Sequence, residues 1–115
     1  MNHHDIFMKC AHMGKCEVCG VEVPVVVVSS RLGPCSCAYC EECYDADLEP
    51  YPMIVAGIWS CGWENMADWA KARIRKILTK LGKTEEEMLS DVKAEDDAFI
   101  AAMQNYEEYC HEQDI

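Results

Sequence analysis

Four cysteines arranged in two close pairs are the residues of this sequence best suited to do chemistry. Cys16 and Cys19 form one Cys-x-x-Cys pair, directly followed by Gly20, and Cys40 and Cys43 form a second pair after an interval of 20 residues. Each pair can direct two thiolates to one side of a tight turn, and Zn2+ takes four such ligands in a tetrahedron. The sequence therefore predicts a structural zinc site, with two disulfides or free thiols as the alternative. Four thiolates leave no open position for water or substrate.

The segments around these pairs predict the elements that position them. Residues 21–28 are rich in valine and indicate a strand, and residues 29–34 have the composition of a turn. A second short strand near residues 34–38 would complete a β-hairpin. The second cysteine pair leads into residues 41–49, which can form a short helix that Pro50 and Pro52 stop.

This order of elements resembles a treble-clef zinc finger. The matching parts are Cys16-x-x-Cys19-Gly, the hairpin over residues 21–37 and Cys40-x-x-Cys43-Tyr. The resemblance covers about residues 16–50, and a zinc ribbon fits almost as well if residues 44–50 are not helical. It implies that the second pair lies in the first helical turn, whose positive end favours the negative zinc–thiolate centre. Neither family determines a function.

The rest of the chain predicts helices. Residues 53–59 are apolar and indicate a strand or a buried connector, whereas residues 64–81 and 85–110 have helical periodicity. Gly82 suits the end of the first helix, and Thr84 with Glu87 forms a capping box for the second. We expect an antiparallel helical hairpin, with Trp69 in its core and Trp63 more exposed. The stripe that would face the first helix, or a second copy of the chain, comprises Leu89, Val92, Phe99, Met103, Tyr106 and Cys110.

These elements predict an α+β fold in which a small zinc-stabilised hairpin module precedes a two-helix hairpin. Residues 1–15 are interpreted as an N-terminal arm, residues 16–62 as the zinc-binding module and residues 63–115 as the helical hairpin. The longest apolar run, residues 53–59, is too short to cross a bilayer. The odd number of cysteines, their metal-like spacing and the lack of an apolar leader in residues 1–15 favour the reducing cytoplasm.

Charge is distributed unevenly along the chain. The net charge is -11, and residues 84–115 contain 11 acidic residues but only one base, Lys93. The preceding stretch, residues 71–83, contains six of the ten bases, and in a hairpin it would neutralise part of the acidic helix. The remaining excess would attract a basic protein partner, and the alternative is that it only maintains solubility. The outer face of the acidic helix would carry Glu86, Glu87, Asp91, Glu95, Asp97, Glu107 and Glu108.

Three further groups of residues suggest alternative chemistry. A second zinc could use Cys10, His12, Cys35 and Cys37. Alternatively, the three cysteines are small buried or exposed residues that bind no metal, or Cys37 replaces Cys40 or Cys43 at the first site. Cys61 could be a reactive thiol near a helix start, but a buried apolar cysteine is the simpler interpretation. The bases of residues 71–83, with Trp63, could contact nucleic acid.

The sequence contains no nucleotide-binding, metalloprotease or nucleophile-elbow motif, and His12 lacks the glutamate that a zinc deaminase needs. We therefore expect a non-enzymatic zinc-binding interaction protein. By analogy, acidic proteins of phages and mobile elements inhibit nucleic-acid enzymes by imitating phosphate arrays. The alternatives are a nucleic-acid-binding zinc-finger protein and a thiol or redox protein that uses Cys61. A homodimer through the long C-terminal helix is a further alternative.

Overall fold

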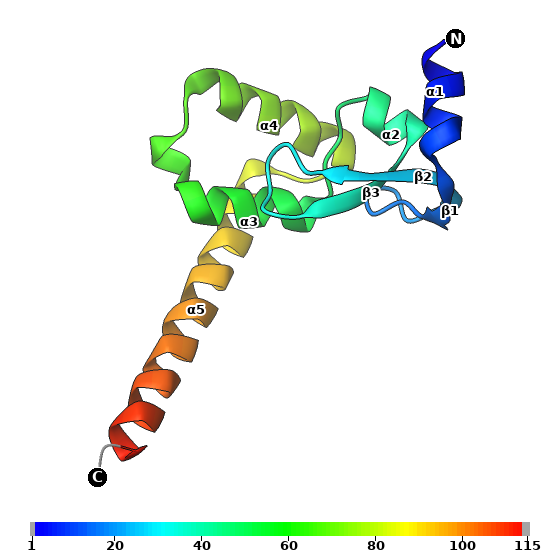
Figure 1. Ribbon diagram of the computed structural model, residues 1–115. Helices are drawn as coiled ribbons and strands as arrows, with labels where there is room; N and C mark the ends of the chain where they lie inside the picture. Colours follow the sequence, from blue (N-terminus) through cyan, green and yellow to red (C-terminus); the bar gives the residue numbers. More distant parts are fainter. Residues whose placement is uncertain (1, 114–115) are drawn as a thin grey trace.

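The computed structural model describes residues 2–113 and confirms an α+β chain (Figure 1). A three-stranded antiparallel sheet and two short helices form one end of the molecule, and longer helices form the other. The elements are α1 (His3–Cys10), β1 (His12–Lys15), β2 (Glu22–Ser29), β3 (Ser36–Cys40), α2 (Glu41–Asp45), α3 (Tyr51–Cys61), the 3-10 helix η1 (Trp63–Asn65), α4 (Asp68–Leu81) and α5 (Glu85–Gln113).

The central strand β2 positions both cysteine pairs. It pairs with β1 on one side, where His12 lies opposite Val25, and with β3 on the other, where Val25 lies opposite Cys40. The end of β1 leads into the first pair and the end of β3 into the second, so both pairs lie at the same end of the sheet. Val25 is fully buried between them. The predicted hairpin is present. The predicted short helix is also present, but α2 ends at Asp45 instead of residue 49, and Pro50 and Pro52 begin α3 instead of stopping α2.

The N-terminal segment is not the arm that the sequence suggested. Asn2 caps α1 by accepting a hydrogen bond from the backbone of Asp5 at 2.8 Å, and Phe7 is buried with only 6% of its surface exposed. β1 then supplies an edge strand to the sheet. The pattern was weak in the sequence because α1 has one buried residue and β1 is four residues long. The backbone pairing with β2, rather than side-chain periodicity, holds this segment.

The apolar segment 53–59 is a helix, not a strand or connector. Pro52 lies in the first turn of α3, where a missing N–H costs nothing, and Ile54, Val55 and Ile58 form its buried face. Gly57 allows the loop before β3 to approach, because a Cβ atom there would lie 2.1 Å from the carbonyl oxygen of Leu32. Branched apolar residues indicated a strand, but packing on both sides of the helix outweighs that preference.

The core of the helical part lies between α3, α4 and the first turns of α5. Its fully enclosed side chains are Ile54, Ile58, Ile74, Ile77, Leu78 and Met88. The predicted helix ends are confirmed at both predicted positions. Gly82 adopts the left-handed conformation after α4, and the Thr84 hydroxyl accepts a hydrogen bond from the backbone of Glu87 at 3.1 Å. Trp69, expected in the core, is instead 73% exposed on α4.

The predicted pairing of α4 with α5 is wrong. Beyond its first turns, which lie in the core, α5 packs against α3 instead of α4. It then projects away from the rest of the molecule (Figure 1). The molecule measures 65 × 33 × 22 Å, and its radius of gyration of 17.9 Å exceeds the value of about 13 Å for a compact chain of this length. Within residues 2–113, no helix combines the length and the apolar content needed to cross a membrane.

Candidate metal centre

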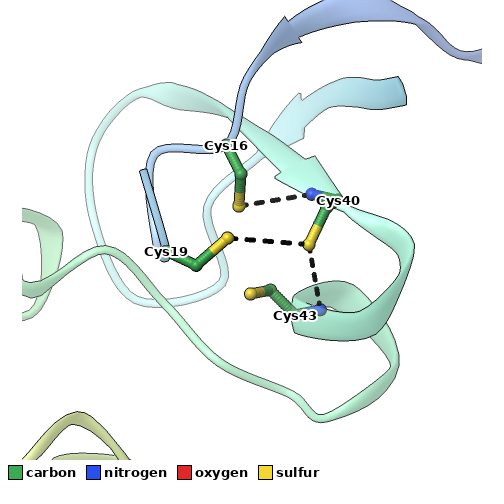
Figure 2. A group of neighbouring side chains, drawn as sticks. All are labelled: Cys16, Cys19, Cys40 and Cys43. Atoms are coloured by element: carbon green, nitrogen blue, oxygen red, sulfur yellow. Dashed lines mark hydrogen bonds between the residues drawn. The ribbon is translucent and has the colours of Figure 1, made fainter. Parts of the chain in front are cut away.

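The first cysteine pair lies in a tight turn between β1 and β2. The backbone N–H of Cys16 donates to the carbonyl of Val21 at 3.0 Å, and the N–H of Gly20 donates to the carbonyl of Cys16 at 2.8 Å. Gly20 has a φ of +78°, a conformation that glycine adopts without the steric cost of a Cβ atom. This geometry returns the chain on itself and directs both thiols to the same side (Figure 2).

The second pair lies where β3 ends and α2 begins. Cys40 is the N-cap of α2, and its sulfur accepts a hydrogen bond from the backbone of Cys43 at 3.5 Å. Cys43 therefore lies in the first helical turn, where the backbone N–H groups favour negative charge. The sulfur of Cys16 also accepts from the backbone of Cys40 at 3.3 Å, which connects the two pairs directly (Figure 2).

The four sulfur atoms lie close enough together to hold one metal ion. All four lie within 4.8 Å of one another, and those of Cys19 and Cys40 are 4.0 Å apart. Four thiolates at the usual Zn–S distance would be separated by about 3.8 Å. Cys16, Cys40 and Cys43 are buried, whereas Cys19 faces solvent. The predicted ligands are thus brought together in an arrangement that can bind a metal ion such as zinc.

The electrostatics of the four thiols are unequal. Burial alone would raise the pKa of Cys16, but backbone N–H groups of Cys19, Cys40 and Val18 outweigh it and lower that pKa to about 7. Burial raises the pKa of Cys43, and its hydrogen bond to Cys40 raises it further. Burial likewise raises the pKa of Cys40. Of these three thiols, Cys16 is therefore the easiest to ionise, and four thiolates would require a bound cation to balance their charge.

The residues of the alternative second site are not brought together. Cys10 ends α1 and is exposed, His12 opens β1, Cys35 is exposed in the loop before β3, and Cys37 is buried within β3. Within residues 2–113, their ligand atoms form no common cluster. Cys61, the candidate reactive thiol, is exposed at the end of α3, contrary to the burial expected for it.

A second cluster, which sequence reasoning missed, attaches α1 to α2. His3 hydrogen-bonds to Asp45 at 2.8 Å, and His4 hydrogen-bonds to Glu41 at 2.7 Å. The Glu41 carboxylate raises the pKa of His4. His3, Glu41 and Asp45 lie within ligand distance of one another, but all three are partly or fully exposed. Two adjacent histidines were the available signal in the sequence, but their partners lie about 40 residues away.

Two acidic residues in the segment between α2 and α3 accept several hydrogen bonds, and one of them, Asp47, connects this segment to α4. Glu49 is 1% exposed and accepts hydrogen bonds from the Ser30 hydroxyl at 2.8 Å, the Tyr39 hydroxyl at 2.6 Å and the backbone N–H of Arg31 at 3.1 Å. Asp47 accepts two hydrogen bonds from Arg73 of α4, at 2.8 and 2.9 Å. No short motif in the sequence marks either residue.

The basic residues of α4 and the acidic residues of α5 are largely separate. Arg75 pairs with Glu85 at the first turn of α5, but Lys71 and Arg75 also lie over the Trp63 ring, and Arg73 pairs with Asp47. The expected neutralisation along a helical hairpin is therefore absent over most of α5. All seven predicted partner-binding residues are exposed: Glu86, Glu87, Asp91, Glu95, Asp97, Glu107 and Glu108.

Comparisons with known proteins identify no relative: no family model, no curated protein and no solved structure matches this chain.

Proposed function

We propose that this protein is a non-enzymatic interaction protein in which a zinc-stabilised module supports an acidic helix for binding to a basic surface of a protein partner. One observation carries the proposal. Every side chain from Lys93 to Tyr109 of α5 is exposed, although the helix continues for 29 residues. A helix in a protein gains most of its stability from packing against other elements. A long helix that is unpacked in the single chain is therefore suited to pack against a partner in a complex.

The metal centre has a supporting role in this proposal. The turn that bears Cys16 and Cys19, the β2–β3 hairpin and the second pair at the start of α2 together support a treble-clef-like zinc module. Four thiolates around zinc would hold the sheet and α2 rigidly, and they would leave no site for a substrate. In the absence of a catalytic cluster in the sequence, binding is the function that remains.

Charge defines the kind of partner. Residues 93–112 of α5 contain six acidic residues and one lysine, and such a helix attracts basic surfaces at a distance. A nucleic-acid enzyme is a fitting partner because its phosphate-binding surface is basic. A protein that occupied this surface would inhibit the enzyme, as proposed by analogy with phage and mobile-element inhibitors. Binding of nucleic acid by α4 is less favoured because Arg73 and Arg75 are paired with carboxylates.

Charge reversal on α5 tests this proposal. A variant with Glu107→Lys and Glu108→Lys should lose its partner in affinity capture from cells, and with the purified partner its association rate should fall and depend less on salt. The matched control carries Glu42→Lys and Glu64→Lys, which change the net charge equally but lie outside α5. Equal partner binding by both variants would assign the acidic residues to solubility alone.

A further inference from the structure

The exposed part of α5 contains an uncharged band between two acidic clusters. Residues 98–106 contain no charged side chain, whereas residues 95–97 are all acidic and residues 107 and 108 are both glutamate. Four large apolar side chains in the band are exposed: Phe99 by 49%, Ile100 by 48%, Met103 by 41% and Tyr106 by 61%. Acidity alone does not account for this composition, because a helix kept only for charge or solubility has no use for large apolar side chains.

Three of these side chains form, together with a cysteine one turn further on, a regular line on one face of α5. We call this line the apolar seam, and it comprises Phe99, Met103, Tyr106 and Cys110. The intervals of four, three and four residues are those of a helix that packs against another helix. The seam continues an interface that is already present, because Val92, seven residues before Phe99, packs against the helical core. Beyond the contact of Phe99 with α3, no element in the described part of the chain covers it.

Charge indicates what does not cover the seam. If two copies of α5 paired in antiparallel fashion around residue 102, residues 95–97 of one copy would lie opposite residues 107–109 of the other. If they paired in parallel and in register, each acidic cluster would face its own equivalent. Both arrangements bring like charges together at each end of a short apolar contact, and like charges at such positions are destabilising.

We propose that the occupant of the apolar seam is an amphipathic helix of a partner protein, with an apolar face of about nine residues and Lys or Arg at both of its ends. The inference rests on the proposed function and specifies its partner. The midpoints of the two acidic clusters are separated by on the order of 17 Å along α5, so the basic groups of the partner should have a similar separation. Apolar contact then supplies affinity, and the flanking charges supply orientation and speed of association.

A synthetic peptide can serve as the partner in a direct test. The probe is a Leu/Lys helix with a leucine seam at the same intervals and two lysines at each end. One control peptide carries glutamate at the ends, and another contains the residues of the probe in scrambled order. Fluorescence anisotropy with the zinc-loaded full-length protein should detect binding of the probe only. Met103→Gln and Tyr106→Gln should each weaken it by about tenfold, since each removes one apolar side chain from the contact.

The matched control on the protein is Ala101→Gln, which places the same side chain on the opposite face of α5 and should leave binding unchanged. Zinc content and helical circular dichroism of every variant show that the fold persists. Equal binding of the scrambled peptide, or unchanged binding by the Met103 and Tyr106 variants, overturns the inference. If the Met103 and Tyr106 variants bind the probe normally but the Glu107→Lys, Glu108→Lys variant does not, the inference on the apolar seam fails and the proposed function stands. If neither kind of variant changes binding, or the probe does not bind, the inference fails, and partner capture with the Glu107→Lys, Glu108→Lys variant decides the proposed function separately.

A measurement of self-association tests the other possible occupant of the seam, a second copy of the chain. Sedimentation of the wild-type protein without peptide should give a monomer at all concentrations. A dimer that Met103→Gln dissociates would show that a second copy covers the seam, and it would overturn the inference.

Discussion

Phe99 of α5 lies edge-on against Trp59 of α3, with ring centroids 5.2 Å apart and ring planes at 62°. The indole N–H of Trp59 also donates to Asp96 at 3.3 Å. Together these contacts mark the point at which α5 leaves the rest of the protein, because every side chain from Ile100 to Tyr109 is exposed. They fix the direction in which the free part of the helix projects.

The contribution of α5 to stability should therefore be concentrated in its first turns. Met88 is fully buried in the helical core, so Met88→Ala should lower the free energy of unfolding by about 2–5 kcal/mol. Phe99 is half-exposed, and Phe99→Ala should cost only about 1 kcal/mol through the lost ring contact. Chemical denaturation of both variants measures the difference. A larger loss for Phe99→Ala than for Met88→Ala would show that the outer part of α5 is packed.

Removal of one thiol from the metal centre should unfold the protein, beginning with the sheet and α2. Structural zinc contributes on the order of 10 kcal/mol to folding, so Cys16→Ser should lose both the metal and the fold. Cys35→Ser alters an exposed cysteine outside the centre and should retain both. Metal analysis of the wild-type protein after metal-replete purification should give one zinc per chain. A zinc-free folded protein would contradict the prediction, and two zinc ions would require a second site.

The ion pair between Asp47 and Arg73 should contribute to stability with a defined pH dependence. The Arg73 guanidinium lowers the pKa of Asp47 against the opposing effect of burial, and Arg31 lowers it further. A carboxylate whose pKa is lower in the folded state stabilises the protein above its unfolded pKa of about 3.9, and this contribution disappears only as the pH falls through the folded pKa.

Asp47→Asn should therefore destabilise the protein by a constant amount between about pH 5 and pH 8. We expect about 1 kcal/mol or less, because the Asp47 side chain is 47% exposed and its charge is screened. Asparagine also tolerates the left-handed backbone at this position, where φ is 59°. Denaturation of both proteins across this range checks the prediction, and a difference that grows toward pH 5 would indicate that another group titrates.

The parts of the molecule that could be predicted from sequence are those set by short-range chemistry. Three features each depend on a few neighbouring residues and are present as predicted. They are the turns of the two Cys-x-x-Cys pairs, the Thr84 capping box and the left-handed conformation of Gly82. The failures depend on distant partners. Residues 53–59 are a helix because the Leu32 loop and the core pack on both of its sides, and Trp69 is exposed because α5 packs on α3 instead of α4.

The buried carboxylate of Glu49 has a consequence for how disorder would spread from the cysteine pairs. It lies between α2 and α3 and receives hydrogen bonds from the strand that ends in Cys40 and from the loop packed on Gly57. Disorder that begins at the cysteines would remove hydrogen-bond donors from this buried side chain, and we expect the disorder to spread into α3 and from there to the base of α5. We therefore expect the cysteine end and the helical end to unfold together, so that loss of a metal ion bound at the cysteines would also release the base of α5.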